Sequence, residues 1–192
     1  MIKRIGLGAL LLSFALPALA QWELDTTHSS VYFISVKNAA VAETHHFGGL
    51  LGYVGEDGAA RVTIDLNSVE TAIDVRNGRM REMLFETVDF PTATVTAKID
   101  PAILAEVAKG ATITAELPVT LGLHGVEKSL DVALTVFSDG ASMRVMTPYP
   151  VLIKAEDFGL APGVEALRAV AGLNSISTAV PVSFSLSFRE VE

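Results

Sequence analysis

Alternation of apolar and polar residues with a period of two is the feature of this sequence that most narrows its fold. The alternation is clearest near the carboxyl end of the chain, where only proline and serine separate the apolar positions, which are Val180, Val182, Phe184, Leu186 and Phe188. A helix would spread these apolar side chains around its circumference, whereas successive side chains of a strand point to opposite faces. The segment therefore predicts a β-strand with one buried face.

Similar patterns recur along the chain and predict eight strands in all. Turn residues rich in Gly and Asp separate many of them. Eight antiparallel strands in one domain can close into a barrel, which removes the exposed edges of the sheet. The expected strands cover residues 30–37, 44–54, 62–66, 92–99, 111–121, 130–136, 142–154 and 180–188.

Two segments follow a helical period instead. Residues 74–86 are rich in helix formers, although Gly78 weakens this helix by about 1 kcal/mol relative to alanine. Residues 161–173 carry apolar residues at threefold spacing, with a proline near the start and a glycine near the end. We expect both helices to lie over an open end of the barrel. The predicted fold class is all-β, an eight-stranded antiparallel barrel with two short helical insertions.

Composition limits how such a barrel is held together. The chain contains no cysteine, so burial of apolar side chains, which form 50% of the residues, has to stabilise it. Residues 21–192 are long enough for one domain with a sizeable core. A barrel of eight strands is just wide enough to be filled by its own side chains or to hold one small ligand. Composition does not choose between these two cases.

Residues 1–20 have the pattern of a secretory signal peptide. Lys3 and Arg4 precede an apolar run over residues 5–16, Pro17 interrupts that run, and small residues follow up to Ala20. The apolar run is too short for a membrane span, which needs about 20 residues. We expect cleavage after Ala20 and release of residues 21–192 into the periplasm as a soluble protein.

The charge balance of the expected mature chain excludes one class of partner. Without Lys3 and Arg4, 12 basic residues remain against 22 acidic ones, so the formal charge is −10. Binding to nucleic acids and to anionic membrane surfaces relies on clustered Lys and Arg, and the sequence contains no such basic patch. We therefore expect no nucleic-acid partner.

Several motifs occur together in one order over nearly the whole of residues 21–192, and in this the sequence resembles the YceI-like family. That family comprises bacterial periplasmic lipid- and polyisoprenoid-binding proteins with a lipocalin-like barrel. Two departures from the family pattern suggest a subgroup. Many relatives have His at the position of Lys37. Many also have an Asp and a Leu in the segment that here reads Asn77-Gly-Arg-Met80. The motifs lie at residues 22–33, 43–48 with Gly52, 64–71, 76–85, 90–91, 121–125 and 157–159.

The resemblance implies that the barrel interior binds the isoprenoid tail of an amphiphilic lipid, such as a polyprenyl chain or a quinone, and that no other cofactor is needed. A transient membrane or membrane-protein partner follows, because such a ligand originates in a membrane. For any single residue, ordinary core packing remains the alternative to contact with lipid. The larger inward candidates are Phe33, Phe47, Leu51, Ile64, Met80, Leu84, Val95, Ile113, Leu134, Met143, Phe158 and Phe184.

Arginines of the first expected helix are candidates for binding a phosphate or pyrophosphate head group. The planar guanidinium groups of Arg76 and Arg79 match the geometry of phosphate oxygens. The alternative is an ion-paired helix surface, because Glu70, Glu82 and Glu86 are close to them in the sequence.

A metal site is not expected, although His28, His45 and His46 suggest one. Zinc sites normally need three or four converging ligands. Adjacent residues of a strand point to opposite faces, so His45 and His46 should not reach one ion. The simpler interpretation of Asp25 and His28 is that they stabilise a turn through side-chain hydrogen bonds.

Two further classes of function compete with lipid binding. Asp25, His28 and Ser29 supply the residue types of a hydrolytic triad, but they crowd into one turn and no G-x-S-x-G motif accompanies them. The sequence also lacks a Walker loop, a dinucleotide fingerprint and an H-E-x-x-H motif, so we do not expect an enzyme. The other alternative is a filled barrel, a stress or interaction protein that acts through its outer surface.

Overall fold

The computed structural model describes residues 20–191. The expected signal peptide lies outside these residues except for Ala20, the first residue of β1. The strands are β1 (Ala20–Leu24), β2 (Ser30–Lys37), β3 (Val41–Phe47), β4 (Leu50–Gly55), β5 (Ala59–Asp65), β6 (Val69–Glu70), β7 (Thr92–Lys98), β8 (Thr112–Leu123), β9 (Val126–Ser138), β10 (Ser142–Met146), β11 (Val151–Lys154) and β12 (Ala179–Glu190).

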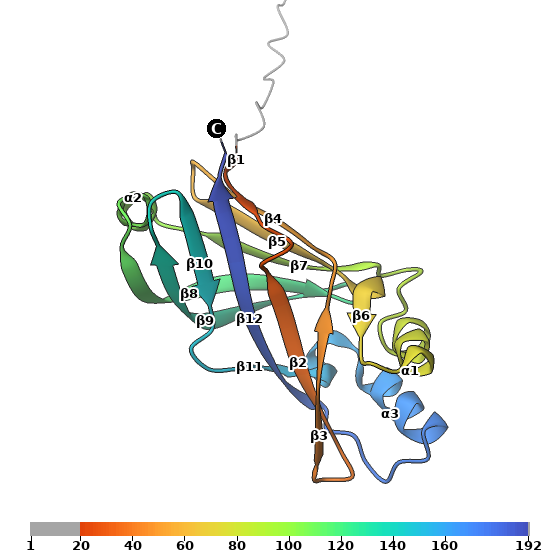
Figure 1. The fold of residues 1–192 in the computed structure, drawn as a ribbon. Coiled ribbons are helices and arrows are strands. Elements are labelled where there is room, and N and C mark those ends of the chain that lie inside the picture. The colour runs from red at the N-terminus through yellow and green to blue at the C-terminus, as the bar shows by residue number, and fades with distance from the viewer. Residues whose placement is uncertain (1–19, 192) are drawn as a thin grey trace, which may run out of the picture.

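A double pairing of β1 closes the sheet into a barrel. β1 pairs with β4 on one side and with β12 on the other. The resulting ring has eight antiparallel strands in the order β1, β4, β5, β7, β8, β9, β10 and β12. The other long strands extend the barrel wall at one end (Figure 1). The part of β12 that lies outside its pairings with β1 and β10 pairs with β2 and with β11. β3 in turn pairs with β2. The predicted eight-stranded antiparallel barrel is therefore confirmed.

At three places along the chain, two consecutive strands are separated by a short break: β1 and β2, β3 and β4, and β10 and β11. Gly48 and Gly49 separate β3 from β4, whereas Pro148 and Pro150 lie between β10 and β11. Proline lacks the backbone donor that a sheet requires, so these positions interrupt the pairing. A turn over residues 25–29 separates β1 from β2. The sequence predicted the segments 44–54 and 142–154 as single strands, and the structure divides each of them in two.

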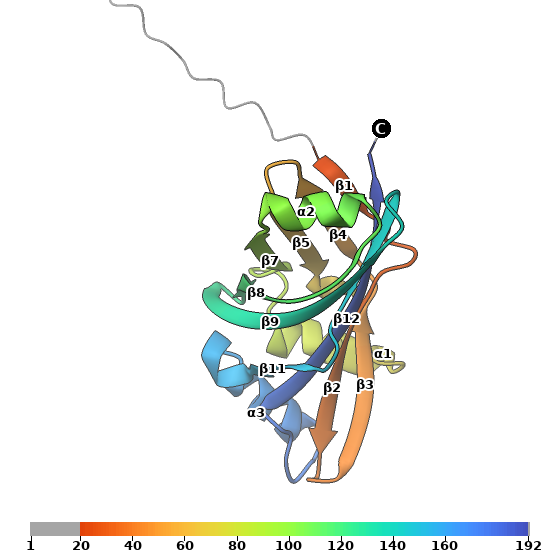
Figure 2. The same ribbon diagram turned by 90° about the vertical axis from the view of Figure 1, so that its left-hand side faces the viewer.

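Short helices cover both ends of the barrel. α1 (Asp74–Arg79) continues into a π-helical turn, η2 (Met80–Leu84), and α3 (Ala161–Val170) packs against that turn, so both predicted helices are present. α2 (Pro101–Ala108) was not predicted. It lies at the opposite end of the barrel from α1 and α3 (Figures 1 and 2). The short 3-10 segments η1 (Leu66–Ser68) and η3 (Ala155–Phe158) complete the chain.

The core lies inside the barrel wall, and a smaller cluster lies beneath α3. Trp22 on β1 is completely buried within the main cluster, which also contains Phe47 and Phe188. The second cluster centres on Phe158, which is 1% exposed, and includes Leu160. The strands thus bury one face each, as the two-residue period predicts.

Candidate functional site

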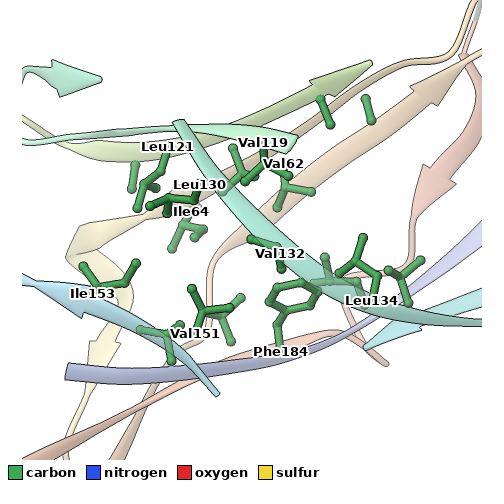
Figure 3. A pocket seen from close by; sticks show the side chains of 18 of the residues that line it. Val62, Ile64, Val119, Leu121, Leu130, Val132, Leu134, Val151, Ile153 and Phe184 are labelled. Atoms are coloured by element: carbon green, nitrogen blue, oxygen red, sulfur yellow. The ribbon is translucent and has the colours of Figure 1, made fainter. Parts of the chain in front are cut away.

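The interior of the barrel contains an apolar cavity of about 310 Å³. Side chains from β5, β8, β9, β11 and β12 converge on it, as Figure 3 shows for Val62, Leu130, Val132 and Phe184. Arg61 is the one residue that is not apolar among those that line the cavity. The volume falls within the range of roughly 300–1,000 Å³ that is typical of ligand pockets. It is about twice the volume of an engineered apolar cavity of roughly 150 Å³ that admits benzene.

The cavity means that the barrel is not filled by its own side chains. Leu130 and Leu134 point inward from β9, yet both remain partly accessible. Small residues on the inner face leave part of this space, since Ala60 and Ala97 lie opposite each other on β5 and β7. Protein interiors normally contain few voids larger than a water molecule, so a space of this size is suited to a ligand.

Helical segments close the two ends of the cavity. Ile103, Leu104 and Val107 on α2 line one end. The predicted helices supply the other end, where Leu84 at the end of η2 and Val164 on α3 line the cavity. The expectation that these helices cover an end of the barrel is confirmed.

Eight of the twelve predicted interior residues line the cavity, and whether they contact a lipid stays a prediction. Of the others, Met80 is buried in the main core, Ile113 packs against that core, and Phe158 belongs to the second cluster. The expected interior position of Leu51 is wrong, because this side chain is 69% exposed on the outer face of β4. The residues that do line the cavity are Phe33, Phe47, Ile64, Leu84, Val95, Leu134, Met143 and Phe184.

Sequence reasoning missed two groups of lining residues. Other inward residues of predicted strands, such as Val62 and Val132, were not selected, although they follow the same two-residue period as the candidates. The residues of α2 were missed because that helix was not predicted. Its signal is present, since Asp100 accepts a hydrogen bond from the Ala102 amide and Pro101 occupies the first turn.

A cluster of charged residues lies beside the cavity, where β2, β3 and α1 meet. Arg76 Nη1 lies 2.9 Å from Glu43 Oε2, and Lys37 Nζ lies 2.6 Å from the same oxygen. The hydrogen bond from Lys37 holds the pKa of Glu43 below its ordinary value, although burial opposes this. Arg76 also donates from Nη2 to the carbonyl oxygen of Thr71 at 2.6 Å. The predicted ion pairing of Arg76 is thus present, but its partner comes from β3.

Two of the three acidic residues that the sequence offered as partners, Glu70 and Glu86, form other contacts. Glu70 accepts hydrogen bonds from the Ala72 amide and from Asn77 Nδ2. Glu86 accepts from His124 Nε2 at 2.8 Å. Within residues 20–191, Arg79 forms no ion pair, and its role as a head-group residue stays a prediction.

His45 is the most deeply buried polar residue near the cavity, at 3% exposed. Its Nε2 lies 2.8 Å from Ser35 Oγ, and its ring packs at a tilt against Phe33, which lines the cavity, with the ring centroids 5.2 Å apart. Burial, reinforced by the charge of Arg76, lowers the pKa of His45, so the ring is neutral at pH 7. His45 Nδ1 and Arg76 Nε are both buried and lack a hydrogen-bond partner within the described part of the chain.

The turn between β1 and β2 has a structural role. Asp25 accepts hydrogen bonds from the Thr27 amide and from His28 Nδ1, and it pairs with Arg189 at 2.9 Å. Ser29 Oγ accepts from the Ser187 amide and lies 3.3 Å from the Ser187 carbonyl oxygen, rather than contacting the His28 ring. The interpretation of Asp25 and His28 as turn-stabilising residues is confirmed.

Neither a metal cluster nor a membrane-spanning helix occurs in the part of the chain that the structure describes. No three His, Asp or Glu side chains in residues 20–191 are arranged to hold an ion. His45 and His46 point to opposite faces of β3, since the first ring packs against Phe33 and the second against Tyr32. None of the helices in residues 20–191 combines the length and apolar character needed to cross a bilayer.

Solved structures share this architecture. A domain from Saccharophagus degradans, described as a polyisoprenoid-binding domain implicated in plant cell wall breakdown, is 44% identical with a TM-score of 0.87 and covers 90% of this chain and 100% of its own. BcnA from Burkholderia cenocepacia is 19% identical with a TM-score of 0.66, over 85% of this chain and 98% of its own. The YceI protein of Campylobacter jejuni is 16% identical with a TM-score of 0.56, over 100% of both chains.

Sequence comparison agrees with the structural likeness. No functionally curated protein matches the chain. The family model described as the YceI-like domain matches residues 22–188, which is nearly the whole described barrel from β1 into β12. The motifs that resemble this family lie within the matched residues, and the chain belongs to the YceI-like family.

Proposed function

We propose that this protein binds one long-chain lipid of the isoprenoid type, with the apolar tail inside the barrel. The observation that carries the proposal is the cavity of about 310 Å³ inside the barrel, lined almost entirely by apolar side chains. Such a surface offers apolar contacts to an extended hydrocarbon chain, and it offers little to a polar substrate.

Burial of the tail supplies the driving force. Each CH₂ group removed from water contributes about 0.8 kcal/mol, so one isoprene unit contributes roughly 3–4 kcal/mol. Ordering of a flexible chain cancels much of this gain. We therefore expect the protein to discriminate tails by the length that fits, and only weakly by their chemistry.

The relative from Saccharophagus degradans supports the choice of ligand class, because that domain is described as polyisoprenoid-binding and is 44% identical to this chain. A polyprenyl chain or a quinone fits the proposal equally. The role is binding rather than catalysis, because the residues that converge on the cavity are apolar and include no nucleophile with an adjacent base.

The proposed setting is the periplasm, reached after cleavage of residues 1–20. A carrier in that compartment would collect its lipid from a membrane or a membrane protein and release it to another. Such contact would be transient, because the acidic surface does not favour lasting attachment to anionic lipids.

A pair of tryptophan substitutions on β9 tests the proposal. Leu130→Trp would occupy the cavity that Leu130 lines, whereas Ser129→Trp adds the same ring to the exposed outer face. Binding of a fluorescent polyprenyl probe should weaken roughly tenfold or more in Leu130→Trp and remain unchanged in Ser129→Trp. Equal binding by both folded variants would show that lipid does not occupy the interior.

A further inference from the structure

The inner face of β2 and β3 changes from apolar to charged along its length. The pairing register places Val31 opposite Phe47 and Phe33 opposite His45. The next inward pair is Ser35 and Glu43, and Lys37 follows at the end of β2. Because alternate residues of a strand share a face, this polar end continues the wall that Val31, Phe33 and Phe47 contribute to the cavity. The charged cluster therefore lies next to the cavity on the same strand face, just beyond the apolar lining that Phe33 and Phe47 provide.

Two nitrogen atoms in this cluster lack partners. His45 is 3% exposed, and its Nδ1 forms no hydrogen bond within residues 20–191, although Ser35 occupies its Nε2. Arg76 uses Nη1 and Nη2 on Glu43 and Thr71, but its buried Nε–H has no acceptor in the described chain. Buried polar groups in folded proteins are nearly always satisfied, so two in one cluster indicate that something else supplies the acceptor.

The charge of the cluster indicates what that acceptor is. Lys37 and Arg76 are both cationic and share the single carboxylate of Glu43, so one positive charge is left uncompensated. His45 adds none, because burial keeps its ring neutral. This excess is local, because the whole chain carries a formal charge of −8. An anionic oxygen would complete both the hydrogen bonding and the charge balance.

We propose that His45 Nδ1 and Arg76 Nε–H bind an anionic oxygen of the lipid head group, a phosphate or a carboxylate, at the charged cluster next to the cavity. The tail then runs away from α1 toward α2, which closes the far end with Ile103, Leu104 and Val107. His45 donates when Ser35 Oγ donates to Nε2, because the ring proton then resides on Nδ1. This inference rests on the proposed function and adds the class of head group and the direction of the bound lipid.

The test compares probes that share one carbon skeleton. Geranylgeranyl phosphate, geranylgeranoic acid, geranylgeraniol and the unfunctionalised hydrocarbon are titrated against the full barrel, with displacement of a fluorescent apolar dye as the readout. The wild-type protein should bind both anionic probes roughly tenfold more tightly than the alcohol or the hydrocarbon, as one charge-assisted hydrogen bond would provide. Similar affinity for all four probes would overturn the proposal.

Two variants remove the proposed contacts while keeping the surroundings. His45→Phe retains a ring that packs against Phe33 but has no Nδ1. Arg76→Lys retains the positive charge beside Glu43 but has no Nε–H group. In both variants the affinity for the anionic probes should fall to within about twofold of that for the alcohol, and binding of the hydrocarbon should be unchanged.

Matched controls separate this role from general effects on folding. His46→Phe changes the neighbouring ring on the opposite face of β3, and Arg168→Lys changes an ion-paired arginine on α3. Both should keep the preference for anionic probes. Survival of that preference in His45→Phe and Arg76→Lys would overturn the head-group site. Failure of every probe to bind the wild-type protein would instead overturn the proposed function.

Discussion

Phe33 and His45 lie opposite each other on β2 and β3, with their ring centroids 5.2 Å apart. Phe33 lines the cavity, whereas His45 contacts Ser35 on its other side. The pair therefore marks the boundary at which the apolar interior of the barrel becomes polar. An amphiphilic ligand needs such a boundary, because its tail and its head group require different surroundings.

A charge introduced on the buried face of β12 should disrupt the protein. Phe184 lines the cavity and packs against the main core, so Phe184→Asp should lower the free energy of unfolding by about 3 kcal/mol or more and abolish lipid uptake. Ser183→Asp, on the other face of the same strand, is the control and should have little effect. Urea unfolding and probe binding measure both results. A Phe184→Asp protein that stays folded and still binds lipid would show that the assigned face is wrong.

Two glycine substitutions should change stability in opposite directions. A Cβ atom at Gly163 would lie 2.6 Å from the Met83 carbonyl oxygen and 2.8 Å from Leu84 Cα, so Gly163→Ala must push α3 away from η2. We expect a loss of about 1–3 kcal/mol. A Cβ atom at Gly78 in α1 meets nothing within 4 Å, so Gly78→Ala should gain about 0.5–1 kcal/mol.

Thermal unfolding of the two glycine variants is the measurement. If both substitutions changed the free energy of unfolding by the same amount, the higher helix propensity of alanine would explain both. That result would contradict the close packing of α3 on η2. The result also bears on ligand entry, since η2 and α3 close one end of the cavity through Leu84 and Val164.

Stability should decrease as the pH falls below the ordinary pKa of histidine, and His45 should cause part of that decrease. Burial, followed by the charge of Arg76, lowers the pKa of His45 below its ordinary value of 6.5, while Glu43 acts in the opposite direction. Lys37 and His46 also lower it. The unfolded chain then binds a proton at a higher pH than the folded protein does, so the free energy of unfolding falls as the pH decreases from 6.5.

Urea unfolding at several pH values between the ordinary pKa values of histidine and glutamate tests this effect. His45→Phe should show a smaller decrease over this interval than the wild-type protein, because its side chain does not titrate. The stabilising effect of Glu43, whose pKa is lowered, is lost only at lower pH. Identical pH profiles for the two proteins would contradict the burial of a neutral His45.

The helix that was not predicted should contribute to stability. Leu104 on α2 is 6% exposed and lines the cavity, so Leu104→Ala should cost about 2–5 kcal/mol. Glu106→Ala on the exposed side of α2 removes only a surface pair with Lys109 and should cost no more than about 0.5 kcal/mol. If Leu104→Ala unfolds at the same urea concentration as Glu106→Ala, α2 does not seal the barrel as described.

The sequence predicted the strands because each long strand buries one face. The alternation at Phe184, Leu186 and Phe188 is sufficient to identify β12 and its inward side, and all three residues line the cavity. α2 escaped prediction because its eight residues are mostly apolar and lie between two strands, so their pattern lacks a polar face. Only the Asp100–Pro101 start signal distinguishes the segment from a strand.

The misplacement of Leu51 has a specific physical cause. If residues 44–54 formed one continuous strand, Phe47 and Leu51 would share a face, because their positions differ by an even number. The break at Gly48 and Gly49 shifts the alternation by one residue, so that Leu50 is buried at 3% and Leu51 is exposed. A shift of one residue moves every following side chain to the other face, and the Gly48-Gly49 pair is the sequence signal for the break.

The charged cluster could be predicted only in part. Arg76 was identified from the sequence as a head-group candidate, but its partner Glu43 lies 33 positions away on β3. The depth of His45 depends on the pairing of β2 with β3, which the strand pattern does not specify. Contacts between distant segments follow from the closed topology of the barrel, and local periodicity does not contain that information.

Native mass spectrometry of the protein purified from its own periplasm, followed by lipid extraction, tests the central claim most directly. We expect a stoichiometric isoprenoid species, or another long-chain lipid, that is released on denaturation. A mass that corresponds to the protein alone, and that does not change after exposure to polyprenyl lipids and quinones, would contradict the claim that the cavity is a lipid-binding site.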